Sequence, residues 1–94
     1  MVTISMRHKV SDYAAWKQVF DDAREIRRSA GEVACRVYTA HGQPDDVLVA
    51  MDWESLDKAR AFLSSPRLME GMAKAGVREL PQIVMLERRD EYRL

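Results

Sequence analysis

His8 is the residue of this chain whose type and position best suit proton transfer. An imidazole has an ordinary pKa of about 6.5 and could act as a general base that removes a phenolic or enolic proton. His8 falls on the same side of an alternating apolar and polar run as Val2, Ile4 and Met6, so it should point towards the apolar cover. A lone histidine there is more often a hydrogen-bonded filler or a rim residue, and both interpretations stay open. The other histidine, His41, lies in a turn-rich segment and is expected to be exposed.

Aromatic side chains could supply a binding surface next to this base. Trp53 ends an apolar strand, where its indole could pack or hydrogen bond against an aromatic ligand. The structural alternative is that Trp53 closes the core with its indole N–H bonded to a carbonyl. Trp16 and Phe20 share one face of a predicted helix, and Phe62 lies on a later one, at spacings that also fit core residues. These four aromatic residues are predicted to line a pocket near His8.

No group of residues has the spacing of a metal site. His8 and His41 with Asp45 or Asp46 match no known ligand pattern, so we expect no metal, and we expect no cofactor. The single cysteine, Cys35, rules out an internal disulfide and fits a reducing compartment. Nothing near it in the sequence would lower its thiol pKa, so we expect a small buried apolar residue rather than a nucleophile.

Periodicity predicts the elements that must position these residues. Alternating residues predict a first strand from Val2 to Lys9, and a helix capped by Ser11 or Asp12 should follow and end before position 31. Two more helices are expected to begin after Ser55 and Ser65. Three further strands are predicted, with a turn over 41–46 between the first two: Val33 to Ala40, Val47 to Trp53 and Gln82 to Arg88.

Helical spacing also divides the helices into faces. The first helix should bury an apolar stripe and expose six charged residues: Lys17, Asp21, Arg24, Glu25, Arg27 and Arg28. On the last helix, Met69 and Met72 fall at a spacing that predicts core positions. The chain has six methionines, and a soft, adaptable pocket or simple gap-filling would explain them equally well.

The order βαββαβ, with the second helical segment divided in two, predicts a single α+β domain over residues 1–94. It is the ferredoxin-like arrangement, in which helices cover one face of an antiparallel sheet. Because two of the strands are apolar on both sides, the second face needs a cover, and a homodimer through this sheet face would supply it. Arg7, Arg36, Tyr38 and Asp52 should form a polar set there, with Arg36 and Asp52 paired across the hairpin or across the dimer.

Composition argues against two classes of partner. The chain has 15 basic and 15 acidic residues, so no overall positive field attracts phosphate backbones and we expect no nucleic-acid binding. No apolar run approaches the roughly 20 residues that cross a bilayer, and the N-terminus lacks a signal-peptide core. We therefore expect no membrane association and a cytoplasmic location.

The stretch from Asp52 to Pro66 resembles a known family. It has a strand that ends in Trp53, a short acidic and serine link, and an alanine-rich helix that ends near Ser65 and Pro66. This pattern resembles the antibiotic biosynthesis monooxygenase-like group of dimeric α+β barrel proteins, and element order extends the resemblance over nearly the whole chain. The resemblance implies a homodimer built from two ferredoxin-like sheets. It also implies a pocket between sheet and helices, which in the resembling enzymes binds a polycyclic phenol or haem.

Some members of that group oxidise the phenol with dioxygen and no cofactor, because the deprotonated substrate itself reduces oxygen. Their sites commonly use an Asn, the Trp and a His on the following helix. This chain has no Asn, and Phe62 and Arg67 stand where histidines are often found, so only Trp53 carries over. The missing amide and imidazole are groups that would stabilise a developing oxyanion.

Two hypotheses follow. In the first, the chain binds an apolar or aromatic metabolite and acts as a cofactor-independent monooxygenase or isomerase, with His8 as base and Trp53 as ligand platform. In the second, it is a non-catalytic dimeric ligand-binding or stress-associated module in which both residues are structural. The retained Trp53 favours the first hypothesis, and the missing Asn and helix His favour the second.

Overall fold

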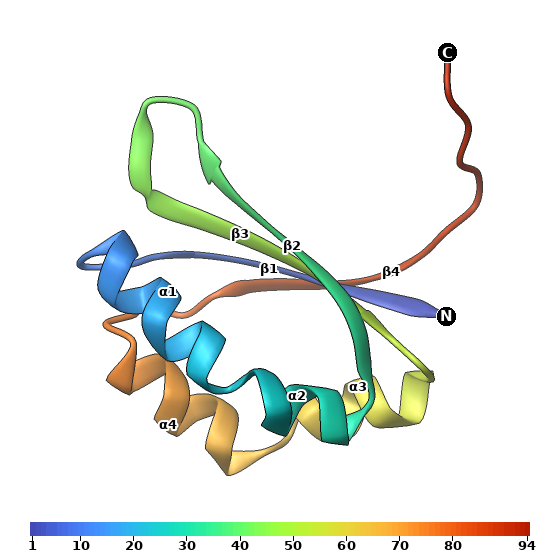
Figure 1. The fold of residues 1–94 in the computed structure, drawn as a ribbon, viewed down its shortest axis with the longest axis horizontal. Coiled ribbons are helices and arrows are strands. Elements are labelled where there is room, and N and C mark those ends of the chain that lie inside the picture. The colour runs from blue at the N-terminus through green and yellow to red at the C-terminus, as the bar shows by residue number, and fades with distance from the viewer.

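The computed structural model describes residues 1–94 as one antiparallel sheet with helices on one of its faces (Figure 1). The four strands lie in the order β2-β3-β1-β4, and every neighbouring pair is antiparallel. The elements follow in the order β1 (Val2–Lys9), α1 (Tyr13–Asp22), α2 (Arg24–Ala30), β2 (Glu32–Ala40), β3 (Gln43–Trp53), α3 (Leu56–Leu63), α4 (Pro66–Lys74) and β4 (Gln82–Glu87). This is the predicted ferredoxin-like α+β fold, with two helices in each crossover. None of the helices has the length and apolar character that crossing a membrane requires.

Short polar side chains begin three of the helices, as the sequence predicted. Asp12, Ser55 and Ser65 each accept a hydrogen bond from a backbone N–H in the first turn of the helix that follows. The donors are the N–H groups of Ala15, Lys58 and Arg67, at 2.9, 3.2 and 3.2 Å respectively. These contacts satisfy N–H groups that a first helical turn leaves without partners.

The first predicted helix is two helices, α1 and α2, separated at Ala23. This residue has φ −88° and ψ 6°, outside regular helix geometry, although its N–H still bonds to the carbonyl of Val19 at 3.2 Å. Beyond the break, the guanidinium of Arg27 turns back and donates to the carbonyl oxygen of Phe20 near the end of α1. Gly31 then ends α2 at φ 121°, a conformation that side chains rarely adopt.

The β2–β3 hairpin is longer than predicted. Strand β3 begins at Gln43 rather than Val47, so the link shrinks to His41 and Gly42. Gly42 adopts φ 78°, which a glycine tolerates without steric cost. Pro44 and its neighbours looked like turn residues in isolation, but pairing with β2 overrides that local preference.

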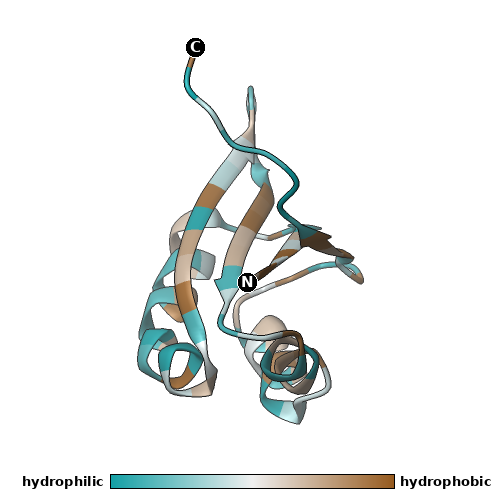
Figure 2. Cartoon of the chain, turned by 90° about the vertical axis from the view of Figure 1, so that its right-hand side faces the viewer, coloured by the Kyte–Doolittle hydropathy of each residue, from teal (hydrophilic) through white to brown (hydrophobic).

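The core lies between the sheet and the helices, which gather on one side of the strands (Figure 2). Alternate residues of the two central strands point into it, each at most 6% exposed: Val2, Ile4, Met6, His8, Val47, Val49, Met51 and Trp53. Because successive strand residues face opposite sides, this buried set fixes the register of the pairing between β1 and β3.

The opposite face of the sheet carries ion pairs beside exposed apolar side chains. Arg36 contacts Asp52 at 3.1 Å, and Arg7 contacts Asp46 at 2.8 Å. The predicted pair of Arg36 and Asp52 therefore forms across the hairpin, within one chain. Exposed apolar residues on the same face are Tyr38, Val84 and Leu86. No helix of this chain covers them (Figure 1).

Cys35 and Met69, which were predicted to be buried, are exposed. Cys35 faces the helix side of β2, opposite Met51, but β2 is an edge strand and the thiol is exposed. Met69 on α4 is 57% exposed, whereas Met72 on the same helix packs partly buried against the core. In both cases the residue was predicted to be buried because it is apolar, but no other element of the chain packs over it.

Candidate ligand-binding site

A cavity of about 330 Å³ lies between the sheet and the helices. This volume falls at the lower end of the range for small-molecule sites, roughly 300–1,000 Å³. The floor is formed by β1 and β3, one wall by α1 and α2, and the other wall by α3 and α4. Of the 20 lining residues, 14 are hydrophobic. The cavity therefore suits a largely apolar ligand.

The wall formed by α1 and α2 is a row of stacked side chains. Trp16 and Phe20 lie on one side of this wall because residues four apart share a helix face, and Arg27 of α2 joins them by reaching back to Phe20. The rings of Trp16 and Phe20 stack with centroids 5.0 Å apart and planes inclined by 15°. The guanidinium carbon of Arg27 lies 3.7 Å from the centroid of the Phe20 ring. A planar ligand would meet a predominantly aromatic surface here.

His8 lies on the cavity floor near the end of β1, where it is 5% exposed. Its ring centroid is 5.7 Å from that of Trp16. No protein group hydrogen bonds to either imidazole nitrogen. Leaving a buried polar group without a hydrogen-bond partner costs free energy. A ligand in the cavity could remove this cost by forming a hydrogen bond to the imidazole of His8.

Burial of His8 should make the protein less stable in mild acid. Burial lowers the pKa of this imidazole below its ordinary value of 6.5, because the charged form loses solvation. The unfolded chain therefore binds a proton at pH values where the folded chain does not. The free energy of unfolding is therefore highest above pH 6.5, where His8 is neutral in both states. It falls as pH drops from 6.5 towards the lowered pKa of His8 in the folded state.

Urea unfolding between about pH 7.5 and about pH 5 measures this effect. Wild-type protein should lose more stability over this interval than His8→Gln, which has no group to titrate at this position. The matched control is His41→Gln, which removes an exposed histidine and should follow wild type. Equal losses in wild type and His8→Gln would show that the imidazole of His8 is not protected from protonation.

Trp53 lies behind the cavity and not on its lining. It is fully buried, and its ring centroid is 4.7 Å from that of Phe62, which does line the cavity. Its indole Nε1 has no hydrogen-bond partner, so the carbonyl contact considered for a purely structural tryptophan is absent. Of the four predicted aromatic residues, Trp16, Phe20 and Phe62 therefore line the cavity, and Trp53 packs against one of them. The roles of all four in binding stay predictions.

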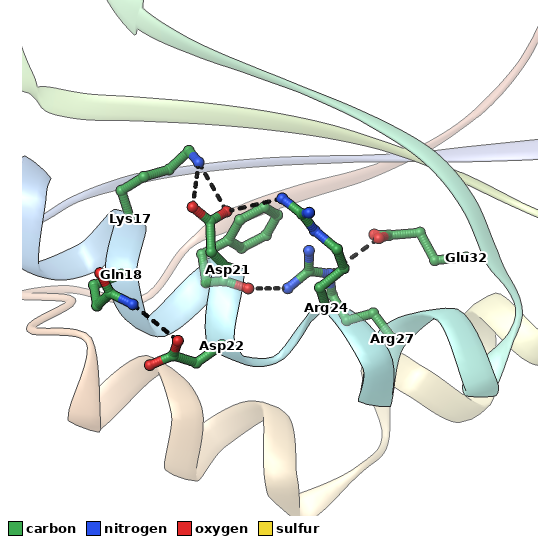
Figure 3. A network of polar contacts seen from close by, with 8 residues as sticks. Lys17, Gln18, Asp21, Asp22, Arg24, Arg27 and Glu32 are labelled. Carbon is green, nitrogen blue, oxygen red and sulfur yellow. Dashed lines mark hydrogen bonds and ion pairs between the residues drawn. The ribbon is translucent and has the colours of Figure 1, made fainter.

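A buried ion pair between Arg27 and Glu32 extends the α1–α2 wall, and the sequence pattern did not predict it. Arg27 was assigned to the exposed face, but it is 4% exposed and its Nε donates to Oε1 of Glu32 at 3.0 Å (Figure 3). The other carboxylate oxygen of Glu32 is buried without a partner, and burial raises the pKa of this carboxyl. The sequence did contain one signal of this burial: Phe20 and Arg27 are seven residues apart, a spacing that places two residues on the same face of a continuous helix.

Lys17 and Asp21 of α1, which were predicted to be exposed, are half-buried, with side chains 34% and 35% exposed. Lys17 contacts both carboxylate oxygens of Asp21, at 2.6 and 2.7 Å, and Gln18 donates to Asp22 at 2.9 Å (Figure 3). Side-chain pairs four residues apart along a helix contribute only a few tenths of a kcal/mol each, about 0.2–0.5. They support the helix without shaping the cavity.

The sequence matches no known protein-family profile and no curated protein. Its fold, in contrast, matches solved structures over most of its length. The cofactor-independent oxygenase SnoaB of Streptomyces nogalater has a TM-score of 0.79 and 17% identity, over 96% of this chain and 94% of that one. A monooxygenase of Streptomyces coelicolor, in complex with nanaomycin D, has a TM-score of 0.73 and 18% identity, over 99% and 91% of the two chains. A protein of Bordetella bronchiseptica, provisionally named an antibiotic biosynthesis monooxygenase, has a TM-score of 0.78 and 18% identity, over 93% and 95%.

This chain has the antibiotic biosynthesis monooxygenase-like fold. The resemblance inferred from the stretch that ends in Trp53 is thus confirmed at the level of the fold, over nearly the whole chain. Sequence identities of 17–18% establish a shared fold and not a shared activity. The activity has to be argued from the residues of the cavity.

On this antibiotic biosynthesis monooxygenase-like fold, the polar part of the cavity lining is small. It consists of five residues: His8, Arg27, Lys58, Ser65 and Arg67. Among them, His8 is the group whose ordinary pKa lies closest to neutral pH, and burial lowers that pKa. No group of three or more His, Cys, Asp or Glu side chains is placed to hold a metal ion. The polar side chains of the lining offer a proton acceptor at His8 and attraction of negative charge by the cations.

Proposed function

We propose that this protein binds a small aromatic ligand in the cavity and that His8 acts there as the general base of a cofactor-independent oxidation or isomerisation. The observation that carries the proposal is the buried imidazole of His8, which faces an apolar cavity with neither nitrogen bonded. Burial favours the neutral form of this imidazole, which leaves one ring nitrogen unprotonated and able to accept a hydrogen bond from a hydroxyl of the ligand. The fold adds support, because SnoaB is a cofactor-independent oxygenase and the Streptomyces coelicolor monooxygenase was crystallised with the ligand nanaomycin D.

The reaction would begin with a hydrogen bond from a phenolic or enolic hydroxyl of the ligand to His8. Transfer of that proton to the imidazole leaves an electron-rich anion on the ligand. In the oxidation, the anion reduces dioxygen: the carbon that is a CH2 group in the keto form of the ligand becomes a carbonyl with one oxygen atom, and the other oxygen atom leaves as water with the two hydrogens, one of which is the proton that the imidazolium gives up. In the isomerisation, the imidazolium returns the proton to a different atom and dioxygen takes no part.

Trp53 would act on the ligand through Phe62. Its indole packs 4.7 Å from the Phe62 ring, measured between centroids, and so holds that ring against the cavity. We include Trp53 in the proposed site as the support of the ligand platform, with Phe62 as the surface that the ligand touches.

The second candidate function is a non-catalytic ligand-binding module, and the composition of the lining favours it. The chain contains no Asn, and the helix that follows Trp53 contains no His. An oxyanion that develops on the ligand would lack these donors, which are worth several kcal/mol in other enzymes, about 2.7–4 for one donor. Both candidates bind an aromatic ligand, but only the first converts it.

We further propose that the uncovered face of the sheet forms the interface of a homodimer. The exposed Tyr38, Val84 and Leu86 lie there beside ion pairs that are already satisfied within the chain. Light scattering at micromolar concentration should give about twice the monomer mass of 10.8 kDa. A mass of 10.8 kDa would contradict this part of the proposal.

A thermal-shift screen against polycyclic phenols and quinones tests the binding proposal, because a ligand that binds only the folded state raises the melting temperature. Conversion of each hit is then followed by oxygen consumption and by chromatography of the products. A hit that is bound and converted supports the first candidate, and a hit that is bound and unchanged supports the second. The absence of any hit among planar phenols that fit the cavity would overturn both.

Gly71 offers a variant that fills the cavity without damaging the fold. It lines the cavity from α4, and a Cβ at this position would meet no atom within 4 Å. The change Gly71→Leu should lower ligand affinity at least about tenfold, since the new side chain occupies the space of the ligand. Stability should be unchanged or higher, because removing a glycine from a helix interior contributes roughly 0.5–1 kcal/mol. The control is Ala73→Leu, at an exposed position of the same helix. Unchanged affinity in Gly71→Leu would place the ligand elsewhere.

A further inference from the structure

The charged side chains in the cavity lining are all positive. Arg27, Lys58 and Arg67 line the cavity, and no Asp or Glu does. This is a local feature, because the whole chain has 15 basic and 15 acidic residues. An apolar ligand that also carries a negative charge would complement this lining better than a neutral one.

The three cations differ in how far they are already neutralised. Arg27 is committed to the buried carboxylate of Glu32. Lys58 pairs with Glu54 at the surface, where both side chains are about half exposed and such a pair exchanges easily. Arg67 is exposed and takes part in none of the ion pairs of the chain. Arg67, with help from Lys58, is therefore the cation available to a ligand.

The N-terminus of α4 adds to this positive charge. Ser65 caps the helix, Pro66 opens it, and its first turn contains no acidic residue. The dipole of a helix is positive at its N-terminus, so a cation such as Arg67 in the first turn is unfavourable unless an anion is near. We refer to Lys58, Ser65 and Arg67 as the cationic end of the cavity.

The cationic end lies opposite His8 along the cavity. Residues just after α4 contact the start of α1, since Ser11 N–H bonds to the carbonyl of Gly76 at 3.0 Å. That is the end where His8 packs against Trp16. The first turn of α4 is one helix length away, about 13 Å for nine residues. Lys58 lies at the same far end, because its side chain packs against Gly31 at the end of α2.

We propose that the ligand of this cavity is an aromatic acid, with its anionic group bound at the cationic end by Arg67 and Lys58 and its hydroxyl directed at His8. The inference rests on the proposed function and narrows its ligand class. The buried, unbonded imidazole sets the position of the hydroxyl, the rings of Trp16 and Phe20 pack against the flat body, and the cations set the position of the acid. A carboxylate or a sulfonate fits this arrangement, because each is a planar or compact oxyanion that an arginine can bind through two N–H groups.

Two fluorescent probes that differ by one charge test the inference. They are 8-anilinonaphthalene-1-sulfonate and N-phenyl-1-naphthylamine, which share the same rings and differ in the sulfonate. In wild-type protein both should bind, and Gly71→Leu should weaken both. Arg67→Gln should raise the dissociation constant of the sulfonate about tenfold and change that of the neutral probe less than about twofold. Lys58→Gln should act in the same direction with a smaller effect.

Arg60→Gln is the matched control, because Arg60 is an exposed cation of α3 outside the cavity lining. It should leave both dissociation constants unchanged. Suppose that both probes bind in the cavity, but that neither Arg67→Gln nor Lys58→Gln weakens the sulfonate more than the neutral probe. The inference is then wrong and the proposed function stands. If neither probe binds, or if Gly71→Leu weakens neither, the proposed function fails and the inference with it.

Discussion

Replacing Arg27 with methionine is expected to lower the free energy of unfolding by about 3–5 kcal/mol. The guanidinium is buried, donates to Glu32 at 3.0 Å, and covers the ring of Phe20. Methionine is shorter and fills only part of the space, and it leaves the Glu32 carboxylate buried without a charge partner. Burial already raises the pKa of this carboxyl in the presence of Arg27. Urea unfolding monitored by tryptophan fluorescence measures the loss.

Two further variants separate the lost ion pair from lost packing. The double change Arg27→Met with Glu32→Leu removes both charges and should recover most of the stability, because a buried ion pair is often replaceable by apolar residues. Arg28→Met is the matched control, since Arg28 is an exposed cation of α2 whose contact with Glu25 spans 3.7 Å; it should change stability by less than about 0.5 kcal/mol. A loss below about 1 kcal/mol in Arg27→Met would mean that Arg27 and Glu32 are not buried together as described.

Replacing His8 with glutamine is expected to lower turnover of a phenolic substrate at least about 100-fold, since general base catalysis contributes about 10²–10⁴. Glutamine keeps a polar side chain of similar reach but cannot take up the proton. The measurement is the rate of oxygen consumption or product formation with a hit from the ligand screen. Binding of the same ligand should persist, because the walls of the cavity are unchanged.

His41→Gln serves as the control and should keep wild-type turnover, because this exposed turn residue lies outside the cavity. The melting temperature of each variant shows whether a slow enzyme is simply unfolded. Wild-type turnover in a folded His8→Gln protein would remove His8 from the mechanism and leave the second candidate, or another base, to explain the cavity.

Features decided by neighbouring residues could be predicted from the sequence. The strand Val2–Lys9 followed from strict alternation, and the helix starts followed from Asp12, Ser55 and Ser65. Each is a local preference that the tertiary structure does not override. The fold class followed from the order of these elements, as the matching structures confirm.

Features decided by contacts between distant residues could not be predicted from the sequence. The helix break at Ala23 carries no glycine or proline signal, and the exposure of Cys35 depends on how far the helical layer extends over an edge strand. The ion pair of Arg27 with Glu32 required knowing that α2 turns back towards β2. For the site, periodicity placed Trp16 and Phe20 on one wall, but only the structure shows His8 without a partner and Trp53 behind Phe62.

The measurement that tests the central claim most directly is the nitrogen-15 NMR spectrum of the histidine side chains during a titration with 1-naphthol, a planar phenol. The chain has only two histidines, so the signals of His8 and His41 are separated by recording the His41→Gln variant. Saturation should shift the signal of one imidazole nitrogen of His8, because the naphthol hydroxyl becomes its hydrogen-bond donor, while His41 should be unaffected. Binding of 1-naphthol that leaves both nitrogens of His8 unshifted, or no binding at all, would contradict the central claim.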